Sequence, residues 1–463
     1  MSLRIYNSLT KQKEEFQPIC PGEVKMYACG ITVSGEAHIG HAIQAMIFDI
    51  IRKYLEKSGY KVTYARNYTD VDDKIINNAN SLGVDPVDFA EENIAKIDKE
   101  MARLGVDDAT MTLRATKHID QIISFTDELI KKGHAYSTDA GDVYFAVESD
   151  PDYGKLSNRN LEDAMNGVRI DLEDNKRNPL DFALWKSAKP GEISWDSPWG
   201  KGRPGWHIEC SVMNYYNLGE QIDIHGGGRD LIFPHHENEI AQTECVTGKN
   251  FAKYWMHNGL VKINGQKMSK SLGNSIFLKD ILDNYDKEII RFALLQTNYK
   301  NDINITDGVF EDAKAHLLSF YKTLQKVYAR KIVNNNKTAS IDTEFNQAMD
   351  DDFNTALAIA NLFGYFKQIN AKLANNDESA IEDANAIIDT YSLLGLFKSD
   401  INKFIADNDI SADIPEDIQN LAESRWQAKQ SRDWATADAL RQQLLDLGYT
   451  IKDSKDTYEI IKN

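Results

Sequence analysis

A strand–loop–helix–strand order near the N-terminus places the strongest constraint on the fold. Residues 25–29 (KMYAC) have the pattern of a buried strand, a glycine-containing turn follows, and a helical pattern at 42–57 precedes the next strand at 61–67. Neighbouring parallel strands need such a helical crossover, whereas antiparallel strands can be joined by short turns. The order therefore predicts a doubly wound α/β fold around a parallel, Rossmann-like sheet.

The alternation of strands and helices is interrupted once and later ends. A helix near 117–132 and a short strand at 142–145 lie among polar loops, which is typical of an insertion. From residue 307 onward helical periodicity dominates and predicts a bundle of packed helices. The predicted segments are two halves of the α/β domain at 1–113 and 205–260, a connective insertion at 114–204, a loop region at 261–306, a helical bundle at 307–400 and a small C-terminal domain at 401–463.

Two local signals concern the connections between elements. Asn264-Gly265 follows a short apolar strand, and this dipeptide favours a β-hairpin turn. The stretch 399–414 is polar and rich in aspartate, and Pro415 closes it. That composition predicts a linker ahead of the C-terminal domain.

Composition indicates a globular protein in a reducing compartment. Hydrophobic residues make up 42% of the 463 positions, which excludes a mainly disordered chain. The N-terminal sequence lacks an apolar signal region, and no stretch approaches the roughly 20 apolar residues of a membrane span. The four cysteines are too few and too scattered for a disulfide framework. We therefore expect a cytoplasmic protein without a membrane span.

The charge balance argues against nonspecific binding of nucleic acid. The chain has 53 Lys plus Arg against 71 Asp plus Glu, a net charge of −18, and residues 401–463 have 8 basic against 12 acidic side chains. A protein that binds phosphate backbones without sequence preference is usually basic. Any polyanion must therefore be bound by local patches and by shape.

The segment His38-Ile39-Gly40-His41 lies where a strand and loop lead into a helix. Two imidazoles and the free backbone N–H groups of a helix N-terminus suit a triphosphate, and the missing Cβ of Gly40 allows close approach. The alternative is that one or both histidines only cap or pack the helix.

A second segment, Lys267-Met268-Ser269-Lys270-Ser271, follows the predicted hairpin. Lys267 and Lys270 form a pair of cations suited to the charge that develops on a leaving pyrophosphate. Taken alone, this run could be a solvated loop. Together, in this order and each after a strand, the two segments predict an ATP site that activates a carboxylate as its adenylate.

Potential metal ligands gather in the same two halves of the α/β domain. Cys29 ends the first strand, Cys210 lies in WHIECS, and His235, His236 and Glu239 lie at the start of a helix after Pro234. Cysteine, histidine and carboxylate donors suit Zn²⁺. Both His235 and His236 have a helical spacing that reaches Glu239, so spacing leaves the choice between them open. The alternative for each cysteine is burial as a small apolar side chain.

The HIGH and KMSKS segments resemble the signatures of the class I aminoacyl-tRNA synthetases. The resemblance implies that His38, His41 and Lys270 contact the ATP phosphates, with Lys267 beside them in the catalytic set. It further implies that Gly226, Gly227 and Gly228, in HGGGRDL, allow the backbone to approach the adenosine, and that Mg²⁺ accompanies ATP.

Further motifs resemble the cysteinyl-tRNA synthetases over essentially the whole chain: CG at 29–30, NYTDVDDKII at 67–76, DFALWK at 181–186, GWHIECS at 205–211 and FPHHENE at 233–239. The resemblance implies one zinc ion per chain, held by Cys29, Cys210, His235 and Glu239. Zn²⁺ binds a thiolate far better than a hydroxyl, so such a site separates cysteine from serine. Gly30, Thr69 and Trp206 match family positions that line the amino-acid pocket.

The C-terminal segment 425–453 resembles the anticodon-binding end of that family. The resemblance implies that Trp434 stacks on a base, that Asp438 and Asp453 accept base-edge hydrogen bonds, and that Lys429 contacts phosphate. The alternative for Trp434 is a place in the core. The implied substrates are ATP, L-cysteine and tRNA(Cys), and the implied form is a monomer that joins cysteine to the 3′-terminal ribose of the tRNA.

Three other functions share parts of this sequence pattern. Ligases that join cysteine to an amino-sugar share the catalytic half but lack the C-terminal anticodon unit. An inactive relative could serve as a regulatory or RNA-binding protein, although HIGH, KMSKS and all four ligand positions are intact. Other nucleotidyltransferases use the HxGH pattern but give no reason for the zinc set.

Overall fold

The computed structural model describes residues 2–159, 176–268, 272–332, 334–409, 415–453 and 458–462. The chain divides into two compact units: Met1–Ala313 with Lys331–Lys398, and Lys314–Arg330 with Ser399–Asn463. In the described residues, no helix is long and apolar enough to cross a membrane.

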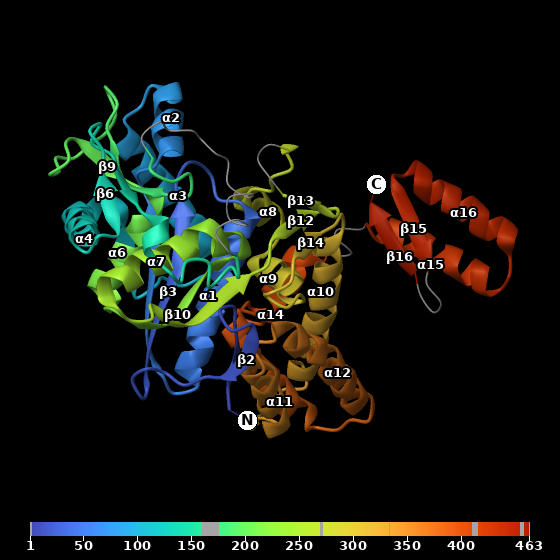
Figure 1. Cartoon of the computed structure of the whole chain (residues 1–463). Helices are drawn as coiled ribbons and strands as arrows, with labels where there is room; N and C mark the ends of the chain where they lie inside the picture. The colour runs from blue at the N-terminus through green and yellow to red at the C-terminus, as the bar shows by residue number, and fades with distance from the viewer. Residues whose placement is uncertain are drawn as a thin grey trace. The chain divides into compact units, whose positions relative to one another are not determined.

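A five-stranded parallel sheet forms the centre of the first unit (Figure 1). The strand order is β11-β10-β3-β4-β5. These strands are β3 (Glu23–Thr32), β4 (Lys61–Thr69), β5 (Met111–Arg114), β10 (Ile222–Gly228) and β11 (Ala252–Asn258). Every neighbouring pair is parallel, so the predicted Rossmann-like sheet is confirmed.

The sheet changes winding direction between β3 and β10. The chain runs outward from β3 to β4 and β5, and then returns to the other side of β3 to form β10 and β11. In doubly wound sheets ligands bind outside the carboxyl ends of the strands at such a point. The carboxyl ends of β3 and β10 are therefore where the fold favours a binding site.

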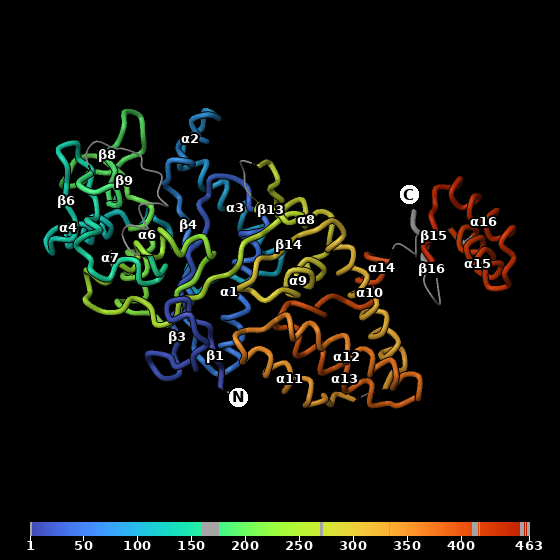
Figure 2. The backbone as a smooth tube through the Cα atoms, turned by 45° about the vertical axis from the view of Figure 1, so that its right-hand side comes forward, coloured from blue at the N-terminus to red at the C-terminus, as the bar shows by residue number. Residues whose placement is uncertain are grey.

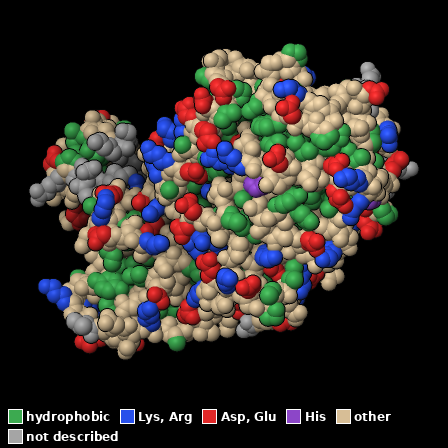
Figure 3. All heavy atoms as spheres, turned by 90° about the vertical axis from the view of Figure 1, so that its left-hand side faces the viewer, with side chains coloured by type: hydrophobic (Ala, Val, Ile, Leu, Met, Phe, Trp, Pro, Cys, Tyr) green, Lys and Arg blue, Asp and Glu red, His purple; other side chains and the backbone are tan. Residues whose placement is uncertain are grey.

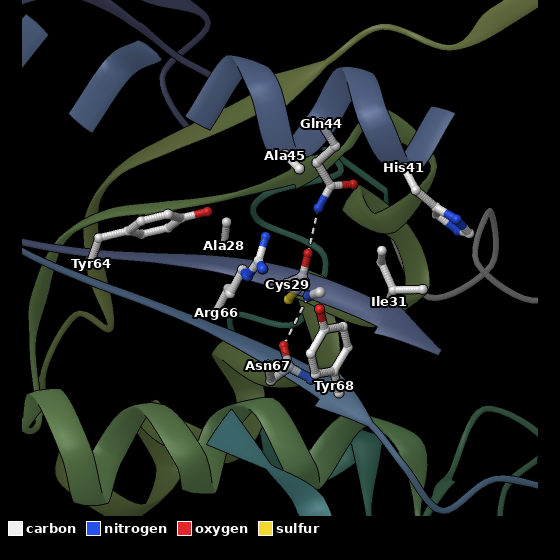
Figure 4. Close-up of a pocket in the computed structure, with 11 residues that line it drawn as sticks. Ala28, Cys29, Ile31, His41, Gln44, Ala45, Tyr64, Arg66, Asn67 and Tyr68 are labelled. Atoms are coloured by element: carbon white, nitrogen blue, oxygen red, sulfur yellow. Dashed lines mark hydrogen bonds between the residues drawn. The ribbon is translucent and has the colours of Figure 1, made fainter. Parts of the chain in front are cut away.

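Helices cover both faces of this sheet (Figure 4). Helix α1 (Ile39–Lys57) lies on one face and presents a buried row that includes Phe48. Helix α6 (Trp206–Leu218) lies on the other face, near α7 (Glu237–Thr247). The connections also contain α2 (Asp73–Leu82) and α3 (Pro86–Leu104), whose N-termini are capped by the side chains of Asp72 and Asp85.

The predicted insertion contains an antiparallel sheet of order β6-β7-β8-β9. Its elements are α4 (Ile119–Lys131), β6 (Ala135–Ser137), β7 (Val143–Phe145), β8 (Phe182–Ser187) and β9 (Gly202–Pro204). The predicted helix near 117–132 and strand at 142–145 are thus confirmed. Phe125 and Trp185 share one buried cluster with Val212 of α6, so the insertion packs directly against the α/β domain.

The region after β11 contains the predicted hairpin. Strand β12 (Val261–Ile263) pairs antiparallel with β13 (Gln266–Lys267), and it pairs parallel with β14 (Ile303–Ile305). Asn264 and Gly265 have φ of 47° and 82°, the left-handed values that a two-residue hairpin turn needs. The hairpin prediction is confirmed. Helices α8 (Leu278–Asn284) and α9 (Lys287–Leu295) lie between β13 and β14.

Packed helices follow, as the sequence predicted. Helix α10 (Val309–Tyr328) crosses the division between the two units. Helices α11 (Ala339–Asp350), α12 (Thr355–Ala374) and α13 (Ala380–Tyr391) pack on one another within the first unit. At the N-terminus, β1 (Arg4–Asn7) and β2 (Gln12–Glu15) form a hairpin (Figure 2).

The second unit contains α14 (Ile401–Asn408), α15 (Glu416–Gln430), α16 (Trp434–Asp446) and the hairpin of β15 (Tyr449–Asp453) and β16 (Tyr458–Lys462). The predicted linker at 399–414 is wrong over residues 401–408, which are helical. Asp400 caps this helix by accepting from the Lys403 N–H at 2.8 Å, and the Phe404 ring stacks on Tyr321 at 3.9 Å. The segment is mostly polar, but it contains one buried aromatic residue, Phe404, that holds the helix in place.

Candidate active site

Four side chains from separate elements meet near the carboxyl end of β3. They are Cys29 of β3, Cys210 of α6, His235 of the turn over Ile232–His236, and Glu239 of α7. Their sulfur, nitrogen and oxygen atoms all lie within 4.8 Å of one another, and all four residues are buried. The Cys29 thiol lies 3.2 Å from Oε1 of Glu239, and Nε2 of His235 lies 3.0 Å from the same oxygen.

The donor set and spacing fit a tetrahedral metal ion. Ligand atoms around zinc stand about 3.3–3.8 Å apart when each bond has its usual length. The 3.0 Å and 3.2 Å separations at Glu239 are close to that range. Two thiols, one imidazole and one carboxylate are the donors that zinc prefers, so these residues could hold it without a change of fold.

The local backbone explains how Cys29 reaches the cluster. The register between β3 and β4 shifts between Ala28 and Ile31, and the N–H of Gly30 donates to Oδ1 of Asn67 at 2.8 Å. A Cβ at Gly30 would lie 1.6 Å from the carbonyl oxygen of Asn67, so only glycine permits this close approach. The Cys29 sulfur lies on the α6 side of the sheet (Figure 4).

The two candidate histidines occupy different positions. Nε2 of His236 lies 3.9 Å from Glu239, farther than the corresponding nitrogen of His235. Cys29, His225 and His236 form a second group whose ligand atoms lie within 4.8 Å, but that group has three donors and shares Cys29. The four-donor group with His235 therefore fits a metal better.

Buried histidines surround the cluster. His225 of β10 contacts Oε2 of Glu239 through Nε2 at 2.8 Å. His236 Nδ1 lies 2.8 Å from Nε2 of His257, and His257 Nδ1 lies 2.8 Å from Oγ of Ser8. Such outer partners orient ligands and tune their basicity. The sequence interpretation did not single out His225 or His257, because nothing in the linear order showed that β10 and β11 flank α7.

Protonation in the cluster follows from burial and from mutual contacts. Burial raises the pKa of the Cys29 thiol well above its ordinary value, and its hydrogen bond lowers the pKa of Cys210 to about 6. Burial acts to lower the pKa of His235, but the charge of Glu239 and the contact with Cys210 raise it to about 10. One thiol is thus already disposed to ionise, as a metal ligand must.

The predicted pocket residues border this cluster on α6 and β4. Trp206 begins α6, and its ring stacks on His235 at 4.3 Å between centroids. The hydroxyl of Thr69, at the end of β4, donates to Oε2 of Glu209 at 2.9 Å. Burial raises the pKa of Glu209 well above its ordinary value. Glu209 was not among the predicted site residues, although it lies inside the GWHIECS motif.

His38 and His41 lie at the N-terminus of α1. Their rings stack at 3.5 Å, the His41 N–H donates to Nδ1 of His38, and the His38 N–H donates to Nδ1 of His41. The capping role weighed from the sequence is therefore present. Both side chains are only partly buried, so capping leaves their rings partly accessible.

The two segments predicted to bind ATP lie close together. The Ile39 N–H donates to the carbonyl of Ile276 at 2.9 Å, and the Leu278 N–H donates to the carbonyl of Ala37 at 2.8 Å. A Cβ at Gly40 would lie 3.6 Å from Cε of Met268. Lys267 is exposed at the end of β13, whereas Ser269, Lys270 and Ser271 lie outside the described residues.

The three glycines at the end of β10 are closely packed. A Cβ at Gly226 would lie 2.2 Å from the ring of Phe48, and one at Gly227 would lie 2.9 Å from His236. A Cβ at Gly228 would meet Oδ1 of Asp230 at 2.6 Å. The packing of α1 and of His236 therefore requires glycine at 226 and 227, independently of any approach by adenosine.

A cavity lined in part by Cys29 lies between α1 and the sheet, on the face opposite the Cys29 sulfur (Figure 4). Cys29, Gly30, His41, Gln44 and Arg66 are among the residues that line it. The Gln44 amide donates to the carbonyl of Cys29, which ties α1 to the strand that holds the first thiol. His41 of α1 and the strand residue Cys29 thus border the same cavity.

The predicted nucleic-acid contacts lie in the second unit. Trp434 is 58% exposed at the start of α16, so it is not a core residue, and Asp438 is exposed one turn later. Lys429 and Asp453, predicted as separate contacts, form an ion pair at 2.7 Å. Arg425 also pairs with Asp453 and lowers the pKa of that carboxyl to about 2. Of these four residues, Trp434 and Asp438 are therefore the more accessible to a ligand.

Three family models match the chain. Residues 15–315 match the class I (C) tRNA synthetase catalytic domain, residues 344–398 the DALR domain, and residues 411–460 the cysteinyl-tRNA ligase anticodon binding domain.

Curated relatives match along the whole chain. The chain is 47% identical to the cysteine–tRNA ligase of Geobacter sulfurreducens, 46% to that of Syntrophotalea carbinolica and 45% to that of Marinobacter nauticus. Each match covers 98% of both proteins.

Solved structures share the fold. A Mycobacterium tuberculosis methionyl-tRNA synthetase in complex with methionyl-adenylate has a TM-score of 0.59 at 14% identity, covering 83% of this chain and 93% of its own. The Agrobacterium radiobacter K84 LeuRS ternary complex has a TM-score of 0.60 at 12% identity, covering 84% and 86%. At these identities the likeness shows the fold alone.

Proposed function

The chain belongs to the cysteine–tRNA ligase family of class I tRNA synthetases, and from that membership we propose how its residues activate cysteine and transfer it to tRNA(Cys). The observation that carries the proposal is the meeting of Cys29, Cys210, His235 and Glu239, in which Cys29 also borders the cavity that His41 of α1 lines. ATP, an amino acid and a tRNA are the substrates of such an enzyme.

The proposed amino-acid site selects a thiol. A zinc ion held by the four buried donors would bind the substrate thiolate and would bind the hydroxyl of serine poorly. The Glu239 carboxylate is held in position by both of its oxygens, which contact His235 at 3.0 Å and His225 at 2.8 Å. The Trp206 ring stacks on His235 and would form one side of the pocket.

The proposed first reaction joins the amino acid to AMP. The cysteine carboxylate attacks the α-phosphorus of ATP, a new P–O bond forms, and the bond to the β-phosphate breaks to release pyrophosphate. His38 and His41 contact the phosphates from the N-terminus of α1, where backbone N–H groups also favour negative charge. Lys267 and Lys270 neutralise the leaving group, and Mg²⁺ accompanies ATP.

The proposed second reaction transfers the acyl group. A hydroxyl of the 3′-terminal ribose attacks the adenylate carbonyl, and AMP leaves. Acidic and basic side chains are interspersed on the face drawn in Figure 3, so tRNA binding must use local contacts more than overall attraction. We assign anticodon contacts to Trp434 and Asp438, and we propose a single chain as the working form.

The amino-sugar ligases fit less well. Those enzymes lack a C-terminal anticodon unit, whereas residues 411–460 of this chain match the cysteinyl-tRNA ligase anticodon binding domain. The second unit also has its own buried cluster, which includes Ile418, Leu444 and Ile451. A folded module in this place supports a tRNA as the acceptor.

Replacing Lys270 by alanine should lower cysteine-dependent ATP–pyrophosphate exchange by about 100- to 1000-fold, because a charge that stabilises the transition state is lost. Thermal unfolding should be unchanged. The matched control is Lys279→Ala, since Lys279 is exposed and pairs with Asp283 within α8. Wild-type exchange by the Lys270 variant would rule out the role assigned to the second segment.

A further inference from the structure

One face of α6 brings a carboxyl group beside the proposed metal ligands. Trp206, Glu209 and Cys210 are three and four residues apart, so they share a face of the helix. Trp206 stacks on His235, and Cys210 belongs to the four-donor cluster. Glu209 therefore lies on the helix face that borders the proposed amino-acid pocket.

The two oxygens of this carboxyl group have different surroundings. Glu209 is fully buried, and its Oε2 accepts a hydrogen bond from the Thr69 hydroxyl at 2.9 Å. Its Oε1 is buried and has no hydrogen-bond partner among the described residues. A buried acceptor without a donor is costly, and in native proteins nearly all such atoms are satisfied. The geometry therefore calls for a donor at Oε1.

The surroundings favour a donor with positive charge. Asp70 and Asp72 lie near Glu209 at the end of β4, and both already accept hydrogen bonds, from Thr116 and from the Lys74 N–H. The described groups that act most strongly on the Glu209 carboxyl are Cys210, Thr69, Asp70 and Asp72, and none of these is a cation. A cation next to its carboxylate would offset the cost of burying that charge.

We infer that Glu209 and Thr69 together bind the α-ammonium group of the amino-acid substrate, an inference that rests on the proposed function. Thr69 donates its own proton to Glu209, so its oxygen lone pairs remain to accept from an ammonium N–H. Oε1 of Glu209 accepts a second N–H. Three bonds separate the sulfur of cysteine from its nitrogen, which suits a thiol site at Cys210 and an ammonium site at the adjacent residue.

The test compares two thiols that differ only in the amino group. Calorimetry on the zinc-loaded full chain, without ATP, would measure the binding of L-cysteine and of 3-mercaptopropionate. Glu209→Gln keeps the size of the side chain and removes its charge. We expect it to weaken L-cysteine about 10- to 100-fold, the usual range for a hydrogen bond to a charged group, and to leave 3-mercaptopropionate within about twofold.

Further variants separate recognition from structure. Thr69→Val should give the same selective loss of affinity for L-cysteine. Thr69→Ser should keep the wild-type affinity, because serine retains the hydroxyl that valine lacks. Glu244→Gln on α7 is the matched control, since Glu244 pairs with Lys155 away from the cluster, and it should leave both affinities unchanged. Zinc content measured on every variant should stay at one per chain.

Two outcomes would overturn the inference while the proposed function stands. In one, Glu209→Gln weakens both thiols by the same factor, which indicates a structural role. In the other, its affinity for L-cysteine equals that of the wild type. If the wild-type chain itself binds no L-cysteine, the proposed function fails and the inference fails with it.

Discussion

Replacing Cys210 by serine should abolish cysteine activation. The substitution removes one of two thiol donors from a fully buried cluster, and a serine hydroxyl is a poor ligand for zinc. We expect metal affinity to fall by more than the 10- to 100-fold typical for loss of an outer partner. Cysteine-dependent ATP–pyrophosphate exchange should fall by a factor on the order of 10³, equivalent to about 4 kcal/mol.

Metal analysis and exchange kinetics on the same preparation check this result. Cys245→Ser is the matched control, because Cys245 lies on α7, only partly buried and outside the cluster. The control should keep one zinc per chain and wild-type exchange. A Cys210→Ser protein with stoichiometric metal and normal exchange would show that the cluster does not bind a zinc ion needed for cysteine activation.

Ending the chain after Asp409 should separate the two reactions. The cut keeps α14 (Ile401–Asn408) intact and removes α15, α16 and the final hairpin, whose buried residues form a cluster of their own. Exchange with cysteine should stay within about twofold, because every proposed activation residue remains. Charging of tRNA(Cys) should fall by more than about 100-fold, or roughly 3 kcal/mol of lost binding.

A point variant refines the same prediction. Trp434→Ala should lower charging about tenfold, since stacking on an aromatic side chain contributes about 1–3 kcal/mol per base. Gln443→Ala, exposed nine residues later on the opposite side of α16, should have no effect. Full charging by the shortened chain would exclude a tRNA role for the C-terminal residues.

The parallel sheet could be predicted because its signal is local. The strand at 25–29, the helix at 42–57 and the strand at 61–67 follow one another, and their order alone fixes a crossover. The incorrect prediction of a linker at 399–414 arose because the helix there depends on a long-range contact. Helix α14 depends on Phe404 packing against Tyr321, a contact between segments far apart in the sequence.

The candidate site could be predicted only in part. Spacing on a helix left His235 and His236 equal, whereas the distances to Glu239 of 3.0 Å and 3.9 Å separate them. His225 escaped notice because its contact with Glu239 depends on how β10 and α7 pack. Glu209 lies within the GWHIECS motif, but only the structure shows that one of its oxygens has no hydrogen-bond partner among the described residues.

The pairing of Lys429 with Asp453 shows another limit of sequence patterns. A charged residue in a motif can be interpreted as a ligand contact, yet burial and neighbours decide whether it is available. Arg425 approaches the same carboxylate from α15, so Asp453 already has two cationic partners. Trp434, by contrast, is exposed although aromatic residues on a helix usually face the core.

The most direct test of thiol selection at the proposed zinc site is ATP–pyrophosphate exchange with purified, zinc-loaded protein, using cysteine or serine as the amino acid, with and without tRNA(Cys). We expect exchange with cysteine in the absence of tRNA. Exchange with serine should be lower by a factor of at least about 10³, because a hydroxyl cannot replace a thiolate at the metal. Comparable exchange with serine, or no cysteine-dependent exchange, would contradict these expectations.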